Sequence, residues 1–153
     1  LAPFGQRGVR ALPRLVYSPG SVTTSGGGLN ITFKVVNYSA SAYTITQIRA
    51  DFSGGADYDV IRINGVTVDS ADNFISGQVV TLTSTTIAAS AATRPSLRVY
   101  VDSPDTQLPD MTITGQGTIA TIELNTFSQD MRGIPFTVTF NPAGVISVVK
   151  FTP

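Results

Sequence analysis

Residues 29–68 read LNITFKVVNYSASAYTITQIRADFSGGADYDVIRINGVTV, and this stretch decides the fold class. In its first part, apolar side chains occupy every second position, at Ile31, Phe33 and Val35. A period of two residues is typical of a strand that has one face in a core and the other in water. We therefore predict a strand over Asn30–Val35.

The second run of the stretch, Tyr43–Phe52, has the same period with one irregularity. Apolar residues alternate up to Ile45 and again from Ile48 onward, so the alternation slips by one residue between these two positions. A β-bulge produces such a slip, because it adds a residue to one strand without adding one to its partner. We predict a second strand here, with a bulge between Ile45 and Ile48.

Two hairpins are indicated by turn residues that separate β-rich arms. Within Val60–Val68, the pair Asn64-Gly65 favours a two-residue turn, in which both central residues take positive φ. Near the end of the chain, Asn141-Pro-Ala-Gly separates the apolar arms Pro135–Phe140 and Val145–Phe151. The sequence therefore predicts a central hairpin and a closing hairpin.

The rest of the chain adds strands and connectors but no convincing helix. About eight to ten short strands separated by Gly, Pro and Asn turns are typical of an antiparallel sandwich. The predicted fold class is therefore all-β, an antiparallel β-sandwich that is either Ig-like or a jelly-roll. We predict further strands over Gln78–Thr86, Ser96–Asp102 and Thr118–Asn125, a flexible connector over Ser21–Gly28, and a loop over Asp69–Asn73.

The chain has few charges for its size. Of 153 residues, 13% are charged, against about 25% in an ordinary globular domain, and ten basic side chains balance ten acidic ones. This balance produces no field that would favour nucleic acid or an acidic membrane. The 20 Thr and 14 Ser indicate an uncharged polar surface, which suits a protein that packs against copies of itself. An uncharged but monomeric domain is the alternative.

Missing residue types exclude several chemistries. The chain has no Cys and no His, which excludes disulfides, thiolate or imidazole metal ligands, and a Ser-His-Asp triad. A glycosidase would have to use two aspartates, because the single glutamate, Glu123, lies on the wet face of a predicted strand. No apolar run is long enough to span a membrane. We predict no enzymatic activity, no cofactor, no bound metal and no membrane span.

Residues 1–19 form an extended leader ahead of a single sandwich domain at residues 20–153. The leader contains three prolines and three arginines but no acidic residue, and its prolines exclude a regular helix. Residues 12–17 are a first strand of their own sandwich, part of an arm that adds a strand to a neighbouring copy, or disordered. In the arm hypothesis, the side chains that fill pockets on the next copy are Val9, Leu12, Leu15 and Tyr17.

Two kinds of surface motif have a structural explanation beside the functional one. The motifs Asn30-Ile-Thr and Asn37-Tyr-Ser have the N-glycosylation form, yet Asn30 and Asn37 are also ordinary turn residues. Loop carboxylates would suit Ca²⁺, but their spacing matches no fixed ligand pattern and Asp is common in turns. These carboxylates belong to Asp57, Asp59, Asp69, Asp72, Asp102, Asp105 and Asp110.

Candidate residues also exist for two binding functions, nucleic-acid binding by arginines and carbohydrate binding by tyrosines. Arg7, Arg10 and Arg14 would contact phosphates if the leader were the basic arm of a capsid protein, and would otherwise be solvated or salt-bridged. A carbohydrate-binding sandwich would stack sugars on exposed aromatic rings, for which the chain offers tyrosines but no Trp. The candidate tyrosines are Tyr38, Tyr58 and Tyr100, whereas Tyr43 lies on a predicted core face.

Four phrases of the sequence resemble a known group of proteins. They are Asn37–Phe52, Val60–Val68, Phe127–Gly133 and Pro135–Phe140, which together are similar to the Ig-like β-domains of prokaryotic extracellular surface proteins and of pilin- or archaellin-type filament proteins. The resemblance covers about a third of the chain and implies a structural domain that packs side by side with copies, without catalytic residues. Type IV pilins begin with a long apolar helix, which this sequence does not contain.

These observations lead to one function and two alternatives. We expect a secreted, extracellular structural subunit of a pilus-like filament or surface assembly, which polymerises by sandwich packing and by strand addition from the leader. The chain begins at Leu1 rather than Met, as expected for a mature form after removal of a signal peptide. Copies of the same chain are the expected partners, and no nucleic acid is expected. The alternatives are a secreted module that binds carbohydrate or protein, and a viral capsid jelly-roll.

Overall fold

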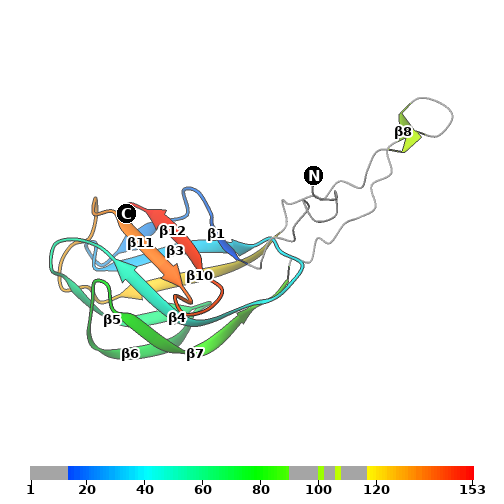
Figure 1. Cartoon of the computed structure of the whole chain (residues 1–153). Coiled ribbons are helices and arrows are strands. Elements are labelled where there is room, and N and C mark those ends of the chain that lie inside the picture. The colour runs from blue at the N-terminus through cyan, green and yellow to red at the C-terminus, as the bar shows by residue number, and fades with distance from the viewer. Residues whose placement is uncertain (1–13, 90–99, 102–105, 108–116) are drawn as a thin grey trace, which may run out of the picture.

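The chain folds as the predicted all-β antiparallel sandwich. A computed structural model describes residues 14–89, 100–101, 106–107 and 117–153 and contains two packed sheets (Figure 1). The six-stranded sheet has the order β1-β3-β10-β5-β6, with β2 also paired to β3, and the four-stranded sheet has the order β12-β11-β4-β7. A separate pair of two-residue strands joins β8 (Tyr100–Val101) to β9 (Thr106–Gln107). The described part of the chain contains no helix long and apolar enough to cross a bilayer.

Most strand bounds agree with the sequence patterns, and of the predicted strand Ser96–Asp102 only Tyr100–Val101 lies within the described residues. The six-stranded sheet contains β1 (Leu15–Tyr17), β2 (Thr23–Ser25), β3 (Asn30–Asn37), β5 (Asp57–Ile63), β6 (Val66–Ile75) and β10 (Thr118–Asn125). The four-stranded sheet contains β4 (Tyr43–Asp51), β7 (Val79–Ile87), β11 (Phe136–Phe140) and β12 (Ser147–Phe151).

The strand order decides between the two predicted forms of sandwich. In Ig-like domains, the first, second, fifth and fourth strands form one sheet, and the third, sixth and seventh form the other. Here β1, β3, β10 and β5 adjoin in that order, and β4, β11 and β12 adjoin in the opposite sheet. The order of these strands therefore matches the Ig-like pattern. Strands β6 and β7 are additional to it at the far edges, and β2 is an additional strand on β3.

Aromatic rings from both sheets fill the centre of the sandwich. Phe33 of β3 lies 4.5 Å from Phe151 of β12, measured between ring centroids, and Phe151 stacks on Phe136 at 5.5 Å. A second group around Phe52 joins Tyr58 and Phe127 at 5.1–6.1 Å. Burial of such a ring contributes about 1.5–3 kcal/mol, so these contacts hold the sheets face to face.

The predicted bulge lies where the sequence places it. The pairing of β4 with β7 shifts register between Ile45 and Gln47. Strand β7 changes phase at the same place, because Leu82 and Ile87 are both buried. The predicted alternation of Val80, Leu82 and Ser84 is therefore wrong at Ser84, which is exposed.

The side chain of Asn141 occupies the space opposite this bulge. Its Oδ1 accepts hydrogen bonds from the backbone N–H groups of Thr46 at 2.8 Å and Gln47 at 3.2 Å, and its Nδ2 donates to the carbonyl of Thr44 at 2.7 Å. The closing turn thus satisfies backbone groups that the irregular part of β4 leaves without strand partners.

Two predicted connectors prove to be ordered strands. The predicted loop Asp69–Asn73 lies within β6. Asp69 and Ser70 pair with β5, whereas residues 71–73 form a bulge at which the register shifts, and the side chain of Asp59 satisfies the N–H of Asn73 there. The predicted flexible connector Ser21–Gly28 contains β2, followed by a turn in which Gly26, Gly27 and Gly28 all have positive φ. These three glycines allow a tight reversal into β3 rather than a free linker.

Candidate assembly site

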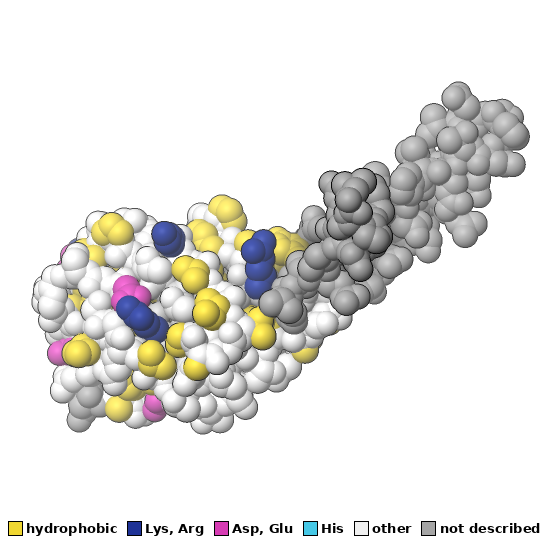
Figure 2. Space-filling view, in the orientation of Figure 1, with side chains coloured by type: hydrophobic (Ala, Val, Ile, Leu, Met, Phe, Trp, Pro, Cys, Tyr) yellow, Lys and Arg dark blue, Asp and Glu magenta, His cyan; other side chains and the backbone are white. Residues whose placement is uncertain are grey.

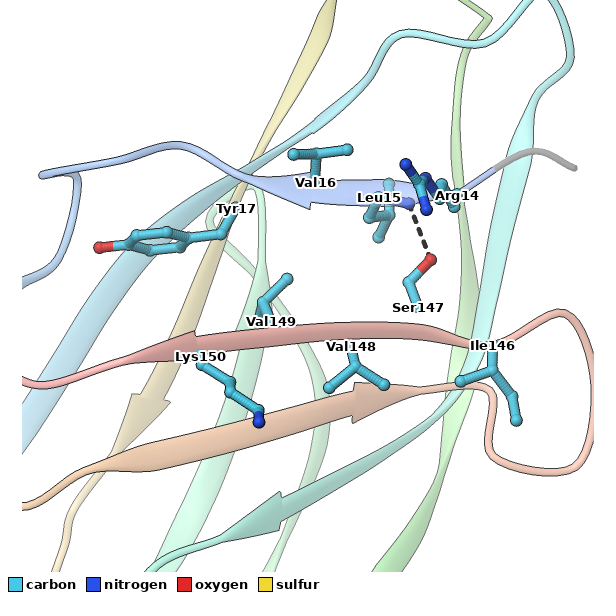
Figure 3. Close-up of a pocket in the computed structure, with 9 residues that line it drawn as sticks. All are labelled: Arg14, Leu15, Val16, Tyr17, Ile146, Ser147, Val148, Val149 and Lys150. Carbon is cyan, nitrogen blue, oxygen red and sulfur yellow. Dashed lines mark hydrogen bonds between the residues drawn. The ribbon is translucent and has the colours of Figure 1, made fainter. Parts of the chain in front are cut away.

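One side of the sandwich is open between two edge strands. Strand β1 is the edge of the six-stranded sheet and β12 is the edge of the four-stranded sheet, and the two run side by side in the same direction (Figure 3). A groove of about 590 Å³ lies between them. The groove is lined by Arg14, Leu15, Val16, Tyr17, Ile146, Ser147, Val148, Val149 and Lys150.

A single side chain bridges the two strands at one end of the groove. The backbone N–H of Leu15 donates a 2.8 Å hydrogen bond to Oγ of Ser147, and both residues are buried (Figure 3). The strands themselves are not paired, so this bond is a point contact rather than a ladder. Within residues 14–89 and 117–153, no other strand pairs with these two edges along the groove.

The pairing pattern shows which backbone groups of β12 face the groove. The N–H of Asn141, which follows β11, donates to Gln47 of β4. Because hydrogen bonding alternates along an antiparallel strand, the backbone groups of Thr137 and Thr139 also bond to β4. Those of the other β11 residues, Phe136, Val138 and Phe140, bond to β12. Their partners in β12, Ser147, Val149 and Phe151, use their backbone groups to pair with β11. Val148 and Lys150 therefore direct their N–H and C=O groups away from β11, toward the groove.

The same alternation applies to β1. The N–H of Ser18 donates to the carbonyl of Lys34 in β3, so Val16, two residues earlier, also bonds toward β3. The backbone groups of Leu15 and Tyr17 then face β12. The groove consequently has hydrogen-bonding edges on both walls.

Apolar side chains surround this edge. Val16, Ile146 and Val148 are 37%, 52% and 50% exposed, respectively, which is unusual for three large aliphatic residues at one place. The charged side chains that line the groove are Arg14 and Lys150, both basic. On the face seen in Figure 2, backbone and uncharged side chains surround small hydrophobic areas, and charged side chains are few.

The structure places the predicted assembly residues differently from one another. Leu15 is buried in the core of its own sandwich, at 2% exposure. Tyr17 is half-buried and stacks on Phe151 with 5.7 Å between ring centroids. Both residues therefore fill their own domain here, as the own-strand alternative expects. Val9 and Leu12 lie outside the described residues.

The two predicted glycosylation residues have very different environments. The Asn37 side chain is fully buried, and its Nδ2 donates to the carbonyls of Ser41 at 2.9 Å, Ala88 at 3.0 Å and Ile87 at 3.3 Å. It thereby joins the end of β3 to the end of β7. Asn30 is partly exposed, and its Oδ1 accepts a hydrogen bond from the N–H of Thr126 at 3.0 Å. Glycosylation stays a prediction, and Asn30 is the more accessible position.

The other candidate ligands do not converge among the described residues. No group of three or more Asp or Glu side chains with metal-binding spacing occurs in residues 14–89 and 117–153. Asp59, for example, lies in β5 and accepts a hydrogen bond from the backbone N–H of Asn73 in β6 at 2.9 Å, so its carboxylate is used in the bulge of the sheet. Asp102, Asp105 and Asp110 lie outside the described part, as do Arg7 and Arg10.

The tyrosines do not form an exposed platform in the described part. Tyr43 and Tyr58 are buried, and the Tyr43 hydroxyl donates to the carbonyl of Val145. Tyr38 is 42% exposed and is the one tyrosine among the candidates whose ring is visible at the surface of the described residues. The side chain of Tyr100 lies outside the description.

Comparison with known proteins adds no family assignment. No protein-family model matches the chain, and no curated protein matches it in sequence. Sequence reasoning identified β12 as half of the closing hairpin but missed Ser147, Val148 and Lys150 as site residues. The edge position of β12 depends on the order of strands in the sheet, for which the local pattern contains no signal.

Proposed function

We propose that this protein is a non-enzymatic structural subunit of an extracellular filament or surface assembly. The observation that supports this proposal best is the open β1–β12 edge. There, backbone groups that pair with no other described strand lie beside the exposed Val16, Ile146 and Val148. Monomeric proteins usually blunt such edges, because an unpaired strand is a template for another chain. A contact of this kind between copies would bury these side chains.

The surface composition supports the same function. With 13% charged residues and no net charge, copies of the chain repel one another weakly. The outward face of the four-stranded sheet has five threonines, Thr44, Thr46, Thr81, Thr137 and Thr139. They lie beside three charged side chains, Arg49, Asp51 and Lys150, so only a few charges would have to be desolvated against another surface. Secretion and the identity of the assembly are part of the proposal.

The first test is assembly with and without residues 1–13 of the predicted leader. Because Leu15 belongs to the core, the deletion should end at Pro13, since a longer one would remove a core strand. We expect electron microscopy of the full chain to show regular polymers that are absent from the variant lacking residues 1–13. A control in which residues 1–13 are replaced by a Gly/Ser segment of equal length separates sequence from length.

Each result of this test has a definite meaning. Polymers from the full chain alone support a structural subunit that assembles through the leader. Polymers from all three proteins would retain the structural function and exclude the leader. Monomers at every concentration in all three, measured by light scattering, would overturn the proposed function.

A further inference from the structure

We propose that β12 is the acceptor strand of the assembly, and that residues from the 1–13 segment of a second copy add to its free edge. The inference rests on the proposed function and identifies the two surfaces that would meet. The added segment would extend the four-stranded sheet by one strand from a neighbouring copy. Backbone hydrogen bonds would provide the affinity, as in other cases of strand addition.

A comparison of the four sandwich edges distinguishes β12. The edge formed by β1 and β2 is interrupted by the turn at Pro19-Gly20, where Gly20 has φ of 74°. Strand β6 has two register shifts against β5, and β7 has one against β4. Interruptions and bulges of this kind prevent pairing with other chains. Strand β12 pairs with β11 over five consecutive residues without a shift, so its edge is the regular one.

The free edge of β12 has the groups that an added strand requires. Val148 and Lys150 direct their N–H and C=O groups outward, as the alternation with β11 requires. On the inner side, Ser147 and Val149 face the groove toward β1 (Figure 3). On the outer side, Val148 is half exposed and would be covered by the side chains of the added strand.

Residues 1–13 have the length and composition to reach this edge on another copy. Thirteen residues precede Arg14, which lines the groove, and when extended they span roughly 40 Å. A five-residue ladder uses roughly 17 Å of that span. Residues 4–12 contain no Pro, so each can donate a backbone hydrogen bond, and Val9 and Ala11 alternate as a pair that can face inward.

The direction of β1 favours a segment from a second copy, rather than from the same chain, as the strand added to β12. Strand β1 enters at the Ile146 end of the groove and runs parallel to β12 (Figure 3). The preceding residues of the same chain would therefore have to reverse at Pro13 in order to lie along β12. A leader that arrives from another copy needs no such reversal.

A proline on β12 tests the acceptor strand without breaking the sandwich. The N–H of Val148 faces outward, so Val148→Pro removes no internal ladder bond but deletes a donor to an added strand. The matched control is Thr81→Pro in β7, the opposite edge of the same sheet. Thr81 is exposed, and because Ile48 bonds to Val80, the Thr81 N–H also faces outward. We expect Val148→Pro to lose the sedimentable polymer and Thr81→Pro to retain it, with both variants folded by circular dichroism.

Crosslinking would identify which segment, and from which copy, lies along β12. The chain contains no Cys, so single-cysteine variants react at one known position. We expect a mixture of Val9→Cys and Val148→Cys chains, treated with a short bismaleimide, to yield a dimer linked between positions 9 and 148, identified by mass spectrometry. A dimer linked between two copies of position 148 would overturn the proposal in favour of β12–β12 pairing. An intramolecular link in the Val9→Cys, Val148→Cys double variant without polymer would assign the site to the chain's own leader.

The two proposals fail in different ways. If the full chain stays monomeric at every concentration, the proposed function fails and the inference fails with it. If Val148→Pro assembles as well as the unmodified chain, assembly stands and β12 is not the acceptor. Loss of polymer in both proline variants, with intact folds, would also overturn the assignment to β12.

Discussion

The backbone N–H of Leu15 and the Oγ of Ser147 are 2.8 Å apart, although the two residues are separated by 132 positions in the chain. Because they belong to different sheets, their hydrogen bond closes one end of the open edge. We expect Ser147→Ala to reduce the free energy of unfolding by about 1–3 kcal/mol, since it leaves a buried N–H without a partner. Urea denaturation would measure the loss, with the exposed Ser53→Ala as the control. A loss no greater than that of the control would contradict this view of the bond.

The bulge in β4 depends on Asn141. We expect Asn141→Ala to cost about 3 kcal/mol, because it removes hydrogen bonds to several backbone groups and puts Ala at a φ of 52°. Asn141→Gly separates the two causes, since Gly accepts positive φ but makes no side-chain bond. The glycine variant should remain destabilised by about 2 kcal/mol in chemical denaturation. Full stability in that variant would assign the effect to backbone strain alone.

The hydroxyl of Tyr58 is buried and has no hydrogen-bond partner among the described residues. Tyr58→Phe removes this desolvated group and keeps the ring that packs on Phe127. We expect the variant to be as stable as the unmodified chain or more stable, by up to about 2 kcal/mol in thermal or urea unfolding. A clear loss of stability would mean that the hydroxyl has a partner.

The same residue should produce an alkaline transition. Burial raises the pKa of Tyr58 above its usual value of 10.0, and the nearby charge of Asp51 adds to the rise. Because the unfolded state loses this proton at a lower pH than the folded state, stability is intact below about pH 10 and falls as the pH rises further. Tyr58→Phe should therefore lose less stability than the unmodified chain in denaturation curves measured above that pH. Tyr43, whose pKa burial also raises, contributes in both proteins.

An exposed ion pair offers a second pH effect at the acid end. Hydrogen bonds from Arg132 lower the pKa of Asp130 to about 2, from 3.8. Any stabilisation from this pair is present above pH 3.8 and disappears as the pH falls through about 2. In Arg132→Gln, an NMR titration of the carboxyl should show the pKa of Asp130 return toward 3.8. High salt should weaken the shift in the unmodified chain, because both side chains are exposed.

Features that depend on neighbouring residues in the chain were predictable. The alternation around Phe33 defines β3, and the slip after Ile45 defines the bulge. The Asn64-Gly65 turn forms with φ values of 52° and 79°, as its residue types require. In each case the cause lies within a few residues, so the sequence contains it.

Features that depend on distant partners were not predictable. The polar segment Asp69–Asn73 forms a strand because β5 lies beside it, and nothing in its own residues indicates that. Leu15 was open to two interpretations, since its burial depends on β3 and on Ser147 at the other end of the chain. The candidate site has the same origin, because an edge exists only once the strand order is known.

The parallel course of β1 and β12 has a mechanical consequence (Figure 3). If tension pulls the chain before Arg14 one way and the chain beyond Phe151 the other way, the two strands slide past each other in opposite directions. The ladders of β1 on β3 and of β12 on β11 are then loaded in shear, so their hydrogen bonds share the force and must rupture together. A hairpin pulled open from one end would instead unzip bond by bond. A domain stretched between its two ends thus meets the load in its stronger direction.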